Sequence, residues 1–215
     1  LSRLANLNSY TTYICKWSMA DGSRTACNYS SVQYGIAIAE YDGEIFALQG
    51  GWTTSASRKV VILSASNLAN TGKTVPYYNG ISAYSYASNM DVDQATGDVY
   101  IVYRDFNGIV RGYDRSDAGS TGPYCASTAC YTQVYTYARY SSSVTVYDGW
   151  VYTNGYYYSS YYGGLKKFPT GGGSVTTLWS SFGSAGYRGS MAVTSDGDCW
   201  ITRNYGNGPY NFQRW

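Results

Sequence analysis

An all-β fold is predicted by two features of the sequence: short apolar and aromatic runs separated by glycine turns, and the recurrence of one such pattern along the chain. The clearest copy lies at 90–116. Its strand-like runs at 90–93, 99–103 and 109–114 are separated by turns that end at Gly97-Asp98 and at Asn107-Gly108. Turns of this composition join antiparallel strands, so the segment predicts one meander.

The glycine of the first turn recurs at intervals of about 50 residues, which is a repeat period. The aligned glycines are Gly43, Gly97, Gly149 and Gly197. Two positions after each glycine the residues are Ile45, Val99, Val151 and Cys199, and the next positions hold Phe46, Tyr100, Tyr152 and Trp200. Apolar and aromatic residues therefore recur in register.

Further strand-like runs complete the repeats and predict a small β-propeller of about four four-stranded antiparallel blades in a single domain. The blades are expected at 34–78, 82–140, 141–179 and 189–215. Residues 63–72 of the first blade could instead form a short helical turn. The last blade has no room for an outer strand. We expect the N-terminal segment 1–34, with a strand at 7–17, to complete it, either in the same chain or in a neighbouring copy.

The blade pattern resembles that of NHL-type and related propellers. An apolar strand runs into DQATGDVYIVY at 93–103 and then, after a glycine turn, into IVRGYD at 109–114. The resemblance covers roughly 33–215 and implies a propeller with a binding face. NHL-type propellers usually have more and shorter blades, and the resemblance implies no reaction.

The composition excludes several partners. The chain has 215 residues with 15 Lys and Arg against 13 Asp and Glu, a net charge of +2 without a basic cluster, which argues against nucleic-acid binding. No run approaches the length of a membrane-spanning helix. The first residue is Leu1, which is typical of a processed or partial chain.

The cysteines and one asparagine favour an oxidising, extracellular location. Cys15 and Cys27 flank a turn at Asp21-Gly22, and Cys125 and Cys130 close a short loop, so two local disulfides are expected; reduced, buried thiols are the alternative. Asn28 begins the triplet Asn-Tyr-Ser, a sequence that can accept an N-glycan.

Catalytic chemistry finds little support. There is no histidine, which excludes Ser-His-Asp and Cys-His nucleophiles and histidine metal sites. Glutamate is limited to Glu40 and Glu44, and the odd cysteine, Cys199, occupies a buried apolar position of the repeat. The segment SDGDCW at 195–200 is similar to the sialidase Asp-box, a structural motif, but is one residue shorter. We therefore expect no enzymatic activity and no cofactor.

Calcium stays open as an alternative, although no metal site is expected. Asp91, Asp93 and Asp98 supply hard oxygen ligands within eight residues. Two of them alternate along a predicted strand, which is awkward for a shared ion, and turn residues that bond their own backbone explain the aspartates equally well.

An aromatic surface and the unfilled last blade suggest self-association. The aromatic residues are Tyr156, Tyr157, Tyr158, Tyr161, Tyr162 and the terminal Trp215. They form either a recognition patch or simply strand ends packed on neighbouring loops. In composition the chain is similar to extracellular fibre and appendage proteins, such as the hair-like flagellar fibres of some algae. We expect a secreted structural subunit of a filament; the alternative is a glycan-binding propeller lectin that stacks sugars on Trp52, Trp150, Trp179 and the tyrosines.

Overall fold

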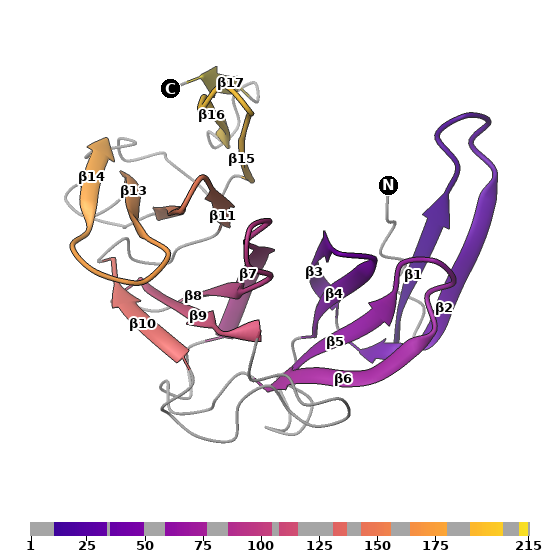
Figure 1. The fold of residues 1–215 in the computed structure, drawn as a ribbon. Helices are drawn as coiled ribbons and strands as arrows, with labels where there is room; N and C mark the ends of the chain where they lie inside the picture. Colours follow the sequence, from indigo (N-terminus) through magenta and orange to yellow (C-terminus); the bar gives the residue numbers. More distant parts are fainter. Residues whose placement is uncertain are drawn as a thin grey trace. The chain divides into compact units, whose positions relative to one another are not determined.

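All regular elements in the described part of the chain are β-strands (Figure 1). The computed structural model describes residues 11–33, 35–49, 59–76, 86–104, 108–115, 131–136, 143–155, 164–179, 190–203 and 211–214. Within these residues there is no helix of a length and hydropathy that would cross a membrane. The chain divides into two compact units, 1–80 with 114–130 and 81–113 with 131–215.

The first unit contains a hairpin and a four-stranded sheet. The hairpin consists of β1 (Thr11–Trp17) and β2 (Arg24–Gln33). The sheet is an antiparallel meander of β3 (Gly35–Tyr41), β4 (Glu44–Gln49), β5 (Lys59–Ser64) and β6 (Asn70–Pro76). Among the described residues, no strand of the hairpin pairs with a strand of the sheet, so the two form separate hydrogen-bonded sheets.

The second unit contains three further meanders in chain order. The first has β7 (Tyr86–Val92), β8 (Val99–Arg104), β9 (Ile109–Tyr113) and β10 (Tyr131–Tyr135). The second has β11 (Ser143–Tyr147), β12 (Trp150–Gly155), β13 (Gly164–Pro169) and β14 (Thr176–Trp179). The third has only β15 (Met191–Val193), β16 (Cys199–Arg203) and β17 (Asn211–Arg214) among the described residues.

The repeated glycines lie in the turns between the first and second strands of each sheet, as the alignment predicts. In two of these turns a non-glycine precedes the glycine with positive φ as well: Asp42 at 49° before Gly43 at 73°, and Asp148 at 48° before Gly149 at 73°. Positive φ at both central residues is the geometry of a type I′ turn, whose twist matches that of the strands it joins. The segment 63–72 joins β5 to β6 through a single turn, in which Leu68 N–H donates to the Ser64 carbonyl four residues earlier as in one turn of a helix, and it contains no helix longer than that turn.

The core of the second unit lies between successive sheets. Tyr100, Val102, Val110 and Val134 of one sheet pack against residues of the next, namely Val144, Val146, Val151 and Phe168. Leu165 in turn packs against Cys199 and Ile201 of the three-stranded sheet. Each sheet therefore buries apolar side chains against its successor, which explains why the repeat keeps apolar residues in register.

Hydrogen bonds from side chains reinforce these contacts between sheets. The Tyr100 hydroxyl donates to the Thr170 carbonyl at 2.8 Å, and the Tyr147 hydroxyl donates to the Ser195 carbonyl at 2.6 Å. At Tyr100 the recurrent aromatic position thus supplies both apolar area and a polar anchor.

Gly112 is required by the Tyr100 ring, which lies over it from the adjacent strand. A Cβ at Gly112 would lie 2.5 Å from Tyr100 Cε1. We expect Gly112→Ala to displace the ring and lower the free energy of unfolding by about 1–3 kcal/mol. Urea denaturation measures the change. Gly171→Ala is the control, because a Cβ there meets nothing within 4 Å. Equal stability of the two variants would contradict the close packing of the ring.

The closing strand differs from the sequence expectation. Among the described strands, β1 pairs with β2 and the last sheet is β15-β16-β17, so β1 does not complete that sheet. The cross-strand pair Cys15 and Cys27 holds β1 in register with β2, which explains the preference. Completion of the last sheet by a neighbouring copy stays a prediction.

Candidate self-association surface

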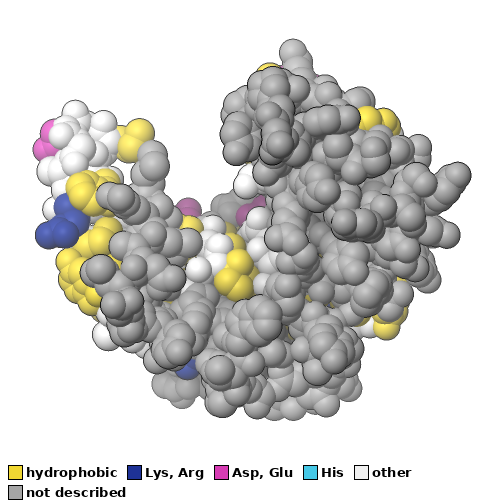
Figure 2. Space-filling model, turned by 180° about the vertical axis from the view of Figure 1, so that it is seen from behind, with side chains coloured by type: hydrophobic (Ala, Val, Ile, Leu, Met, Phe, Trp, Pro, Cys, Tyr) yellow, Lys and Arg dark blue, Asp and Glu magenta, His cyan; other side chains and the backbone are white. Residues whose placement is uncertain are grey.

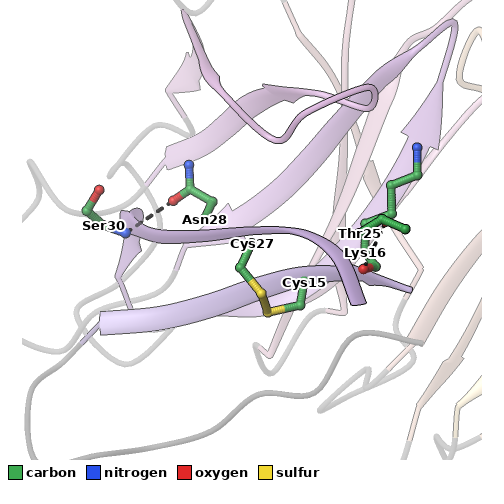
Figure 3. The surroundings of a disulfide bond; sticks show 6 residues. All are labelled: Cys15, Lys16, Thr25, Cys27, Asn28 and Ser30. Carbon is green, nitrogen blue, oxygen red and sulfur yellow. Dashed lines mark hydrogen bonds between the residues drawn. A yellow bond between two sulfur atoms is a disulfide. The ribbon is translucent and has the colours of Figure 1, made fainter. Parts of the chain in front are cut away.

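The β1–β2 hairpin has two faces of different character, and they follow from its register. Ile14 pairs with Asn28 and Lys16 pairs with Ala26, which places these four residues on one face. Cys15 pairs with Cys27 and forms a disulfide, which confirms the first expected cysteine pair. Because side chains alternate along a strand, the disulfide lies on the opposite face (Figure 3).

The face that carries Ile14 packs on the sheet β3–β6. Ile14 and Val32 are 3% and 0% exposed, and both belong to one buried cluster with sheet residues. The sheet residues of that cluster are Ala47, Val61, Leu63 and Leu68. The Lys16 ammonium adds a hydrogen bond of 3.0 Å to the carbonyl of Ala65, in the turn between β5 and β6. Side chains therefore hold the hairpin against the sheet.

Asn28, the expected glycosylation site, connects the hairpin to that same turn. Its Nδ2 donates to the Leu68 carbonyl at 2.8 Å and to Ser31 Oγ at 2.9 Å, while its Oδ1 accepts from the Ser30 and Ser31 amides. The bond to the Ser30 amide is drawn in Figure 3. An asparagine amide has two hydrogens, and both are donated here. A glycan on Nδ2 would require one of these bonds to break, so glycosylation of Asn28 stays a prediction that the observed geometry does not favour.

Five large apolar side chains are exposed on the hairpin and on β3, the strand that follows it. We call this set the hairpin surface: Trp17 (42% exposed), Met19 (90%), Tyr29 (51%), Ile36 (37%) and Ile38 (41%). The rings of Tyr13 and Tyr29 meet edge to face with centroids 5.2 Å apart. Figure 2 shows hydrophobic side chains in yellow along the hairpin, beside basic side chains in dark blue.

Sequence reasoning missed the hairpin surface because it followed the density of tyrosine. The available signal was Trp17 and Met19, two apolar residues just before and within a turn where polar residues are usual. In β3 the signal was weaker. Ile36 and Ile38 alternate with Ala37 and Ala39, so the pattern did not distinguish a buried face from an exposed one.

The aspartates considered for calcium serve separate structural roles. Asp91 Oδ2 accepts hydrogen bonds from Thr145 Oγ1 at 2.9 Å and from the Val146 amide at 2.8 Å, both in the adjacent sheet. Asp93 Oδ1 accepts from the Ala95 amide within its own turn. In the described part of the chain, no three His, Cys, Asp or Glu side chains are grouped as metal ligands would be. Calcium is therefore not proposed.

The Asp91 carboxyl predicts a dependence of stability on pH. Burial raises its pKa above the ordinary value, and hydrogen bonds from Val146 and Val92 oppose that effect. A raised pKa in the folded state means that the native protein binds the proton more tightly than the unfolded chain does. The stabilisation from this group is therefore present below the unfolded pKa, near 3.9, and is lost as the pH rises through the folded pKa.

We expect Asp91→Asn to become more stable relative to the wild type as the pH rises from about 4 to 7. The amide oxygen can still accept from Thr145 and Val146 and the buried charge is removed, whereas the amide nitrogen cannot accept from the Val92 N–H, a loss that is the same at every pH. Urea denaturation at several pH values checks this. The exposed Asp148→Asn is the matched control. A stability difference between Asp91→Asn and the wild type that is independent of pH would contradict the raised pKa.

The Cys199 thiol and the Glu44 carboxylate both have structural roles. Cys199 is 3% exposed, and burial raises the pKa of its thiol to about 11, which confirms its role as a small core residue. The Glu44 carboxylate accepts from Lys73 Nζ at 2.7 Å and from Arg115 Nη2 at 3.1 Å. These two ion pairs tie the start of β4 to β6 and to the segment after β9.

The tryptophans proposed for sugar stacking are engaged with protein groups. The Lys167 ammonium lies 4.2 Å from the centroid of the Trp150 ring and covers it as a cation–π contact. Trp179 packs against the cluster of Leu165, Cys199 and Ile201. Trp52 lies outside the described residues, so no sugar site is built from these three.

The remaining expected site residues also lie outside the described part of the chain. They are Cys125 and Cys130 of the second disulfide, and Tyr156, Tyr157, Tyr158, Tyr161, Tyr162 and Trp215 of the aromatic patch. Their roles stay predictions.

Comparisons with known proteins concern the fold. No family model and no curated protein matches the sequence. The chain is similar to apo AztD from Citrobacter koseri, with a TM-score of 0.51 and 9% identity over 97% of this chain and 61% of that one. It is also similar to the WD40 domain of Pan2 from Neurospora crassa, with a TM-score of 0.54 and 13% identity over 92% of this chain and 57% of that one.

The chain thus spans less than two thirds of either matched chain. Nothing in these matches is specific to NHL-type blades, so that resemblance stays a prediction. WD40 repeats form β-propellers, and the successive antiparallel meanders described above are the blades of such a fold. The chain has a small β-propeller fold.

Proposed function

We propose that the chain is a non-catalytic structural subunit of an extracellular filament or appendage, which assembles with copies of itself. The observation that carries the proposal is the hairpin surface, five large apolar side chains exposed on a disulfide-linked hairpin and the strand beside it. Large apolar side chains that stay exposed mark candidate protein–protein contacts.

Two further properties support assembly outside the cell. Only 13% of the residues are charged and the net charge is +2, so electrostatic repulsion between copies is weak. The Cys15–Cys27 disulfide is compatible with an oxidising compartment. Each feature is common alone, and their combination favours a structural role.

Electron microscopy of the protein as purified from its source tests the proposal. We expect filaments, and we expect Met19→Lys or Ile38→Lys to shorten or abolish them by placing a charge on the hairpin surface. Leu178→Lys is the matched control, because Leu178 in β14 is 44% exposed but lies in the other unit. Dispersed single particles at every protein concentration would overturn the proposal.

A further inference from the structure

We infer that the β1–β2 hairpin is an exchangeable element, which docks on the sheet β3–β6 of a second copy of this chain through the same contacts that it makes with its own sheet. The inference rests on the proposed self-assembly and names its mechanism. It differs from the expected exchange of a single strand into the last sheet, because the moving element is the whole hairpin in which β1 is already paired with β2.

The hairpin holds its own structure. Its two strands form a separate two-stranded sheet, and the Cys15–Cys27 disulfide crosses it. Thr25 Oγ1 adds a bond to the Lys16 carbonyl at 3.2 Å, and the Tyr13 and Tyr29 rings contact each other on the outer side. An element with these internal links can leave one sheet and dock on another without losing its fold.

The contacts that hold the hairpin are of a kind that a second copy can reproduce. Ile14 and Val32 enter the apolar face of the sheet, and two side-chain donors reach the turn between β5 and β6. None of these contacts belongs to the ladder of the sheet. An exchanged hairpin therefore recovers the whole interface, which is the condition for domain swapping.

The connection between hairpin and sheet favours exchange. β2 ends at Gln33 and β3 begins at Gly35, so a single residue, Tyr34, joins them. The hairpin docks on its own sheet with this link, and a short hinge loop invites swapping where it is strained. With the link extended, β2 and β3 would run on as one strand of roughly 60 Å, at about 3.3 Å per residue.

The docking face extends beyond what the hairpin covers. Ile38 pairs with Ala47, which belongs to the buried cluster under the hairpin, so both lie on the same face of the sheet. Ile38 nevertheless stays 41% exposed. Because each copy carries one hairpin and one such face, exchange joins copies head to tail and builds an open chain when the operation does not close.

A complementation experiment with two full-length variants tests the exchange. Ile14→Arg places a charge on the docking face of the hairpin and leaves the sheet unchanged. Ala47→Arg places a charge on the docking face of the sheet and leaves the hairpin unchanged. We expect each variant alone to be monomeric and the mixture to form a one-to-one complex that grows no further, as measured by light scattering after size-exclusion chromatography. Ser30→Arg, on an exposed residue of β2, is the control and should assemble as the wild type does.

A variant with a longer link tests the exchange without changing any buried residue, so a failure of the Arg variants to fold does not affect it. Inserting about ten Gly and Ser residues after Tyr34 leaves every contact residue unchanged and gives a flexible link. The effective concentration of the tethered hairpin is then on the order of millimolar, so at micromolar protein its own sheet is favoured about a thousandfold and assembly should be lost.

The outcomes separate the mechanism from the proposed function. If the wild type forms filaments but the folded variants form no complex and the link variant still assembles, the exchange is wrong and the filament proposal survives. If the mixture forms the one-to-one complex while the wild type forms no filaments, the exchange holds and the filament proposal is wrong.

Discussion

Replacing Phe168 with alanine should lower the free energy of unfolding by about 3–5 kcal/mol, which is the usual cost of removing a buried aromatic ring. Phe168 lies in β13 and is 1% exposed. It belongs to the cluster in which Tyr100 and Val110 of one sheet meet Val146 and Val151 of the next. The cost is large because the rigid strands on both sides of the cluster cannot close the cavity.

Urea denaturation followed by tryptophan fluorescence measures this loss. The exposed Leu178→Ala, in the adjacent strand β14, is the control and should change the stability by less than about 0.5 kcal/mol. A loss below about 1 kcal/mol for Phe168→Ala would contradict the packing of the two sheets and remove the main support for the blade arrangement of the second unit.

The sequence predicts this core well because the repeat of about 50 residues places apolar and aromatic residues at the positions that the structure buries. The glycine turns fix where strands begin. At the second and third positions after the glycine, Val99-Tyr100 and Val151-Tyr152 are 0–9% exposed as the repeat requires, whereas Trp200 of the last sheet is 39% exposed. The alternation of inward and outward residues in a strand then places their neighbours. Local signals and long-range packing point to one answer, so the sheets could be derived from the chain alone.

The N-terminal segment could not be derived in the same way. The sequence predicts that the strand of this segment joins the last sheet, because the repeat leaves that sheet without a fourth, outer strand. Instead, Cys15 and Cys27 hold β1 to β2. The hairpin also contains an irregular register. Thr12 and Ile14 are two positions apart while their partners Val32 and Asn28 are four positions apart, and Asn28 caps the extra residues. No periodic pattern encodes such a bulge, so the faces of the hairpin emerge only from the structure.

The roles of the candidate site residues could not be predicted from the sequence either. An asparagine followed by Tyr29-Ser30 has the sequence of a glycan acceptor, yet its amide nitrogen donates to Leu68, forty residues away. Asp91 has the composition of a calcium ligand but bonds the neighbouring sheet. In both cases the partner is distant in the sequence, and only the packing of one element on another determines what the polar group does.

Removing the Cys15–Cys27 disulfide should destabilise the hairpin by about 3 kcal/mol, because the bond closes a loop of 12 residues in the unfolded chain. Loosening of the hairpin should also uncover Ala47 and Val61, which it now buries. We expect Cys15→Ser/Cys27→Ser to show faster amide hydrogen exchange in β1 and β2 than the wild type, while β11–β13 of the other unit stay protected.

The double variant isolates this bond from every other cysteine. A reductant added to the wild type should reproduce the effect in β1 and β2 and should leave those strands of the double variant unchanged. Cys199 does not interfere, because burial keeps the pKa of its thiol at about 11, so almost none of the reactive thiolate is present near neutral pH. If hydrogen exchange in the hairpin were the same with and without the disulfide, the contacts of Ile14, Asn28 and Val32 with the sheet would be sufficient by themselves. The pairing of β1 with β2 would then depend on the docking of the hairpin more than on its disulfide.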